Sequence, residues 1–142
     1  MDKTLVNTLL DNLKEALNKI ERMDLSVDMI LGDEDIQDLI DRRMQMAIEI
    51  CIDIASHLAA GMQLPRREKA SDIFILLSEN SIISLDIADK MAGAVGLRNI
   101  IVHEYADLDY VLAYSDLNTK LEDLRIFAKE VSKFLIKAKL GS

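Results

Sequence analysis

Chain-breaking residues are almost absent from this sequence, which contains one proline and five glycines in 142 residues. Leucine, isoleucine, alanine, methionine, glutamate and lysine are abundant instead, and these residue types are compatible with helices. Hydrophobic residues make up 50% of the chain, which at this length is enough for one compact domain with a core. We therefore predict an all-α fold in a single domain that spans residues 1–142.

Apolar residues recur every three or four positions along most of the chain, which is the periodicity of amphipathic helices. The segment from Met23 to Gly32 lacks a long stripe and is predicted as a loop. The expected architecture is an up-and-down bundle of about five helices. The predicted helices are one from Leu5, a long one capped by Asp33 that ends near Gly61, a short one after Pro65, one opened by Ser81 or Ser84, and a last one after Asp107.

Several individual residues fit ordinary structural roles. The lone Cys51 stands between two isoleucines and is expected to be a small buried hydrophobe. Tyr110 and Tyr114 follow the apolar positions of the last helix, which indicates core or interface residues rather than catalytic groups. The acidic run from Gly32 to Asp35 suits the positive end of a helix dipole. No Cys/His cluster has the spacing of metal ligands, so we expect neither a metal nor a cofactor.

The chain is acidic, with a formal net charge of −8 and a pI near 4.7. Such a charge opposes non-specific adhesion to phosphate backbones, so any contact with RNA has to be local. The candidate basic cluster is Arg66 to Lys69, to which Arg42, Arg43 and Lys90 can add, and solvated surface charge stays open as the alternative for each. The amphipathic start of the chain shows neither a signal peptide nor a membrane span, which predicts a cytoplasmic protein.

The segment from Arg98 to Tyr105 places polar functional groups beside an otherwise apolar helix. On a helix that turns about 100° per residue, Arg98, Asn99, His103 and Tyr105 fall within one arc of about 160° and can line one cleft. Asn99 and His103 are four residues apart, so the amide can hydrogen-bond the imidazole. Arg98 and His103 lie about 140° apart, however, and meet poorly on one phosphate unless two copies face each other across a two-fold axis.

The order of these four residues resembles the signature of the HEPN superfamily, in which Asn follows Arg, His comes four residues later and Tyr two residues after that. The fuller string from Leu97 to Tyr105 is similar to the HepT branch of that superfamily. Three other segments also resemble the family, so the resemblance covers nearly the whole chain. They are Ala47 to Cys51, Asp72 to Leu77 after Pro65, and Leu124 to Phe127.

This resemblance implies a HEPN-type bundle that acts as a metal-independent endoribonuclease, the toxin of a type VII HepT/MntA toxin–antitoxin pair. In such an enzyme the 2′-hydroxyl of the RNA attacks the neighbouring phosphate at a homodimer cleft. His103 would act as general base or acid, because imidazole exchanges protons near neutral pH. Arg98 would stabilise charge on the phosphate oxygens, and Asn99 would orient the imidazole or hold a phosphate oxygen.

The resemblance also implies a role for Tyr105. The partner antitoxin, the minimal nucleotidyltransferase MntA, is expected to attach AMP to this hydroxyl. A bulky anionic group beside Arg98 would fill the cleft and cancel its positive potential, which would exclude RNA.

Two other functions stay open on the sequence. The bundle can be the non-catalytic subunit of a two-chain nucleotidyltransferase, in which Arg98 and Asn99 bind a nucleotide phosphate or the substrate. It can also be a helical interaction protein whose Arg98 and His103 only form hydrogen bonds across a dimer. The acidic pI mildly favours these alternatives, whereas a toxin that acts at a few accessible RNA sites needs only a local positive cleft.

Overall fold

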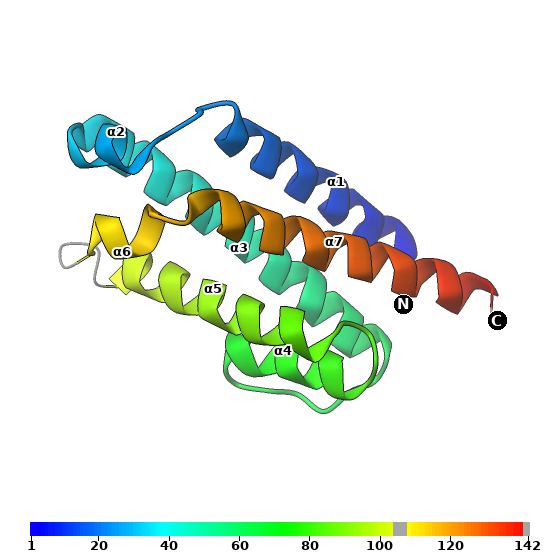
Figure 1. Ribbon diagram of the computed structural model, residues 1–142. Helices are drawn as coiled ribbons and strands as arrows, with labels where there is room; N and C mark the ends of the chain where they lie inside the picture. The colour runs from blue at the N-terminus through cyan, green and yellow to red at the C-terminus, as the bar shows by residue number, and fades with distance from the viewer. Residues whose placement is uncertain (104–107, 141–142) are drawn as a thin grey trace.

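The computed structural model describes residues 1–103 and 108–140, and every regular element in that part of the chain is a helix (Figure 1). The longer helices are α1 (Lys3–Glu21), α3 (Glu34–Gly61), α4 (Ala70–Glu79), α5 (Leu85–His103) and α7 (Leu117–Leu140). Two helices of five residues, α2 (Val27–Leu31) and α6 (Tyr110–Tyr114), connect some of them. The predicted all-α fold is therefore confirmed, and the five longer helices match the number expected.

Four of the helices form the bundle. Helix α1 packs against α3 and α7, and α5 packs against the same two helices from the other side. Helix α4 covers α5 and also contacts α3. The short helices α2 and α6 contact each other at the end of the bundle opposite the two chain termini (Figure 1). Buried side chains from all seven helices join in one core, so α5 is enclosed by α3, α4 and α7.

Helix α3 has the bounds that the sequence predicts. Its first N–H groups are capped by Asp33, whose Oδ1 accepts hydrogen bonds from the backbone N of Asp35 at 2.9 Å and of Ile36 at 3.3 Å. Such a cap contributes about 1 kcal/mol to helix stability. The helix ends at Gly61. Within it Cys51 is fully buried, and this burial raises the pKa of its thiol, as expected for a structural hydrophobe.

Helix α5 begins at a clamp between two helices. Ser84, rather than Ser81, caps it, because the Ser84 Oγ accepts a hydrogen bond from the backbone N of Ile87 at 3.2 Å. Glu130 of α7 then binds Ser84 twice. Its Oε1 accepts from the Ser84 backbone N at 2.6 Å and its Oε2 from the Ser84 hydroxyl at 3.0 Å. The start of α5 is therefore fixed to α7.

The sequence reading was wrong at two connections. The predicted loop between Met23 and Gly32 contains α2, which Ser26 caps through the backbone N of Met29 and which Ile30 anchors in the core. The predicted last helix is broken at residues 115–116 into α6 and α7. Its apolar period continues across the break because α6 and α7 each present an apolar side to the same core, so periodicity alone does not reveal the interruption.

A buried carboxylate joins α3 to α6. Asp41 is only 6% exposed, and it accepts hydrogen bonds from the hydroxyls of Tyr110, at 2.6 Å, and Tyr114. Burial raises the pKa of Asp41, with a smaller contribution from the Asp38 charge, while the two tyrosine hydrogen bonds oppose that rise. Burial and the bond to Asp41 also raise the pKa of Tyr114. The expected structural role of both tyrosines is confirmed.

We predict that Tyr114→Phe lowers the free energy of unfolding by about 1.5–3 kcal/mol, because it leaves a buried carboxylate with one hydrogen bond fewer. Urea denaturation followed by circular dichroism measures this change. In an Asp41→Asn background the same substitution should cost clearly less. Equal costs in the two backgrounds would show that the hydroxyl does not act through Asp41.

Candidate active site

The described residues of the Arg98 to Tyr105 string, which are Arg98 to His103, lie on the last two turns of α5. Neighbouring helices leave this part of the α5 surface uncovered. Leu97 and Ile101 are buried and hold these turns against the core. Asn99 and His103 are exposed, and Arg98 is half-buried between them and the core. The prediction that these residues line one cleft stays a prediction, because the cleft requires a second copy of the chain.

Arg98 is held at the edge of the core without a complete set of partners. Its Nε is buried and makes no hydrogen bond within residues 1–103 and 108–140. Leaving a buried donor unpaired costs about 1–3 kcal/mol. The stability of the described part of the chain therefore does not explain an arginine at this position, and its guanidinium forms no ion pair within residues 1–103 and 108–140.

A single copy of the string does not assemble one reaction centre. Arg98 and His103 are separated by about 140° around the helix and by about 7.5 Å along it. The hydrogen bond that the spacing allows between Asn99 and His103 is not formed in the described part of the chain. The three side chains therefore share a surface, but each is free to contact a molecule that approaches from outside.

The same uncovered strip of α5 contains two exposed glycines, Gly96 and Gly93, two and five residues before Arg98. A Cβ added at either position would meet nothing within 4 Å. Glycine inside a helix costs roughly 0.5–1 kcal/mol relative to alanine, and the core of this chain does not require it here. The strip is therefore smooth enough for another helix to approach closely.

Tyr105 lies outside the described residues, so its proposed role has no geometry here. Among the residues that the structure describes, no group of three or more His, Cys, Asp or Glu side chains is placed to bind a metal ion. In the acidic run, Asp33 caps α3, and Glu34 and Asp35 lie in its first turn, at the positive end of the helix dipole as predicted.

The sequence match decides the family. Residues 13–131 match the family described as Ribonuclease HepT-like. The chain belongs to the HepT-like ribonuclease family. The HEPN resemblance and the ribonuclease class predicted from the Arg98 to Tyr105 string are therefore confirmed.

Relatives of this HepT-like chain match it over most of their length. The mRNA nuclease HepT of Shewanella oneidensis is 30% identical over 127 residues, which cover 89% of this chain and 95% of that protein. The tRNA nuclease HepT of Aphanizomenon flos-aquae is 26% identical over 132 residues, covering 93% and 86%. The structure of the tri-AMPylated Shewanella oneidensis HEPN toxin in complex with MNT antitoxin matches with a TM-score of 0.85 at 28% identity, covering 94% of this chain and 99% of that one.

The basic residues of this HepT-like chain divide into paired and unpaired groups. Lys90, which the sequence placed among the candidate RNA contacts, forms ion pairs with Asp86 at 3.2 Å and Asp123 at 3.6 Å, and these carboxylates raise its pKa. It is therefore largely neutralised. Arg66, Arg67 and Lys69 are exposed in the connection before α4.

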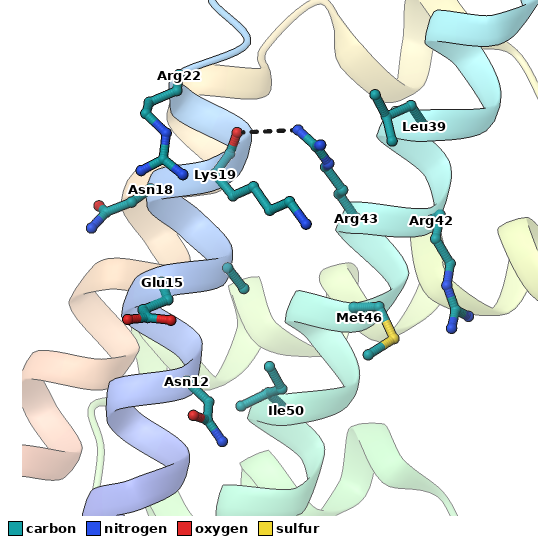
Figure 2. Close-up of a pocket in the computed structure, with 11 residues that line it drawn as sticks. Asn12, Glu15, Asn18, Lys19, Arg22, Leu39, Arg42, Arg43, Met46 and Ile50 are labelled. Atoms are coloured by element: carbon teal, nitrogen blue, oxygen red, sulfur yellow. Dashed lines mark hydrogen bonds between the residues drawn. The ribbon is translucent and has the colours of Figure 1, made fainter.

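The sequence named Arg42 and Arg43 as candidate RNA contacts but did not join them to Lys19 and Arg22 in one site. Arg42 and Arg43 of α3 line a groove together with Lys19 and Arg22 near the end of α1 (Figure 2), and we call it the α1/α3 groove. The signal was present, because Lys19 and Arg22 are three residues apart on one helix face and α1 and α3 are consecutive long helices. Within the described residues, no helix of this HepT-like chain has the length and apolar character needed to cross a membrane.

Proposed function

We propose that this HepT-like chain is the toxin of a toxin–antitoxin pair, and that it cleaves cellular RNA in the cytoplasm without a metal ion, at a cleft formed by two copies of the chain. The observation that carries the proposal is the position of Arg98, Asn99 and His103 on an uncovered strip of α5. The nuclease activities of the two HepT relatives support RNA as the substrate.

A two-fold dimer through α5 accounts for three features of the strip. It brings Arg98 of one copy toward His103 of the other. Within one helix these two side chains point about 140° apart and meet poorly on one phosphate. It gives a function to the Arg98 guanidinium, whose Nε has no hydrogen-bond acceptor among the described residues. It also uses the open space at Gly93 and Gly96, because small residues let two helices approach closely.

The chemistry follows from these side chains. One imidazole takes the proton of the 2′-hydroxyl, whose oxygen attacks the adjacent phosphorus while the bond from phosphorus to the 5′-oxygen breaks. The departing oxygen takes its proton from water, so a cleft needs the imidazole of one copy only. Arg98 donates hydrogen bonds to the phosphate oxygens, on which negative charge accumulates in the transition state. Asn99 positions the imidazole or a phosphate oxygen.

His103→Ala should reduce cleavage of a labelled RNA by about 10²–10⁴-fold, because general acid–base catalysis contributes that much. EDTA should leave the rate of the unsubstituted protein unchanged. The exposed position of His103 predicts an unchanged unfolding free energy within about 0.5 kcal/mol, so a folded, inactive variant is expected. Unchanged cleavage would remove His103 from the mechanism, and absence of cleavage by the unsubstituted protein at any concentration would favour a non-catalytic binding subunit.

Mixing two inactive variants tests the shared cleft. A dimer of one Arg98→Ala copy and one His103→Ala copy retains one cleft with both side chains if Arg and His come from different copies. Random mixing makes half of the dimers mixed, and each mixed dimer has one intact cleft of its two. About a quarter of the full activity should therefore return. If both side chains of a cleft come from one copy, no activity returns, and the two-copy site is excluded.

We further propose that a nucleotidyltransferase antitoxin of the MntA type inactivates this toxin by attaching AMP to Tyr105. The support is the position of Tyr105 two residues after His103, together with the tri-AMPylated state of the related Shewanella oneidensis toxin. AMP adds a bulky anionic group next to the catalytic residues in the sequence, and such a group opposes the binding of RNA.

Co-expression with the nucleotidyltransferase should raise the intact mass of the chain in AMP-sized steps and abolish RNA cleavage. Tyr105→Phe removes only the hydroxyl and is the matched control, which should keep its mass and its cleavage activity in the same cells. Mass additions that persist in Tyr105→Phe would place the modification on another residue.

A further inference from the structure

The α1/α3 groove gathers positive charge that the Arg98 site does not use. It has a volume of about 660 Å³, and its lining contains four basic side chains and one acidic side chain, Glu15. The whole chain carries a net charge of −8, so this surface has the opposite sign from the protein average. An anionic ligand is the partner that such a surface selects.

The four groove cations are not neutralised by the fold. Elsewhere Lys90, Lys120 and Arg125 each form ion pairs with nearby carboxylates. Lys19, Arg22, Arg42 and Arg43 form no ion pair within the described part of the chain, although acidic residues outnumber basic ones by 25 to 17. Unpaired cations in an acidic protein keep their full capacity to bind phosphate.

Arg43 is fixed across the groove. Its guanidinium donates a hydrogen bond to the backbone oxygen of Lys19 at 3.3 Å, and its Nε is buried without an acceptor among the described residues. Figure 2 shows Lys19 and Arg43 extending into the space between α1 and α3, with Arg42 on the side of α3 away from α1. Arg43 resembles Arg98 in this respect, since both have donors that the fold leaves unused.

The size and the lining fit a nucleotide. A volume of about 660 Å³ lies in the range of small-ligand sites, about 300–1,000 Å³. Leu39 and Met46 are 42% and 41% exposed and, with Ile50, provide a limited apolar wall for a base. This wall is much smaller than the roughly 800 Å² that each partner contributes to a stable protein interface. One or two nucleotides of a strand match the groove better than a protein does.

The groove lies close to the level of the Arg98 string along the bundle. Met44 and Ile48, which neighbour the groove residues on α3, line one cavity with Leu97 of α5. Arg43 precedes Met44 and Arg98 follows Leu97 in the sequence, so the groove and the Arg98 string lie at neighbouring levels of the bundle. Arg42 lies on the side of α3 that faces away from α1 (Figure 2).

We infer that the α1/α3 groove binds the RNA substrate outside the cleavage site, with its cations on phosphates of the strand and its apolar wall against a base. The inference rests on the proposed ribonuclease function, and it adds a second contact region that sets substrate length and affinity. Because the groove contributes binding but no reacting group, it affects KM and leaves kcat unchanged.

The test compares two charge-matched double variants of the full-length chain. Lys19→Gln/Arg43→Gln removes two groove cations, and Lys133→Gln/Lys137→Gln removes the same charge from exposed positions of α7. Binding of fluorescent 2′-O-methyl RNA of 12 and 4 nucleotides is measured by anisotropy, since this RNA has no 2′-hydroxyl to react. Lys19→Gln alone serves if the groove double variant unfolds, because no side-chain bond of Lys19 is lost.

The groove variant should bind the 12-nucleotide RNA about tenfold more weakly or worse, and the 4-nucleotide RNA with little change. The slope of log Kd against log salt should flatten by about 1.4, from roughly 0.7 for each lost contact with single-stranded phosphate. The control variant should keep the affinity of the unsubstituted chain. With cleavable 12-nucleotide RNA, the groove variant should show a raised KM at unchanged kcat.

Unchanged RNA affinity in the groove variant, or an equal loss of affinity in the control variant, would overturn the inference. Competition by AMP as strong as that by the 12-nucleotide RNA would also overturn it. So would a groove variant that loses binding of the nucleotidyltransferase but keeps its RNA affinity. The binding assay does not require cleavage, so a chain that binds RNA through the groove without cutting it would reject the proposed ribonuclease function alone.

Discussion

The enclosure of α5 by α3, α4 and α7 is the constraint on which the rest of the structure depends. Three helices cover this one, and Glu130 of α7 fixes its first residue through Ser84. Only one strip of its surface remains open. The functional string lies on that strip with Leu97 and Ile101 locked beneath it, so a rigid element of the core presents Asn99 and His103 to the outside. A site on a packed helix holds its geometry better than a site on a loop.

The distribution of charge gives a second view of the same molecule. An acidic protein repels RNA over most of its surface, which limits binding to places where cations are concentrated and unpaired. Within the described residues, Lys90, Lys120 and Arg125 are paired with carboxylates. Arg98 and Arg43 are not, and each lies on a face that neighbouring helices leave accessible. Net charge therefore limits where RNA can bind, while Arg98 and Arg43 supply the donors that bind its phosphates.

Local patterns predict much of this fold because helix periodicity and capping are local properties. Asp33, Gly61 and Ser84 mark helix ends through contacts within a few residues of themselves, and the Arg98 to Tyr105 string is contiguous. The break between α6 and α7 has no local signal, and the α1/α3 groove joins cations of two helices, of which only the spacing of Lys19 and Arg22 is a local pattern. Asp41 illustrates the point, since its hydrogen-bond donors lie 69 and 73 residues away. The proposed approach of Arg98 to His103 depends on a second molecule, so the local pattern of one chain does not specify its geometry.

The open space next to Gly93 and Gly96 separates two constraints on substitution that usually act together, which are packing within the chain and contact with a partner. Most positions in a small bundle tolerate change only as far as their own core allows. At these two glycines the core sets no limit, since an added methyl group meets nothing inside the chain. Drift toward larger residues is then opposed only by whatever is apposed to α5. Across homologues, the size of the side chain at these two positions therefore reports on contact with a partner and not on folding stability.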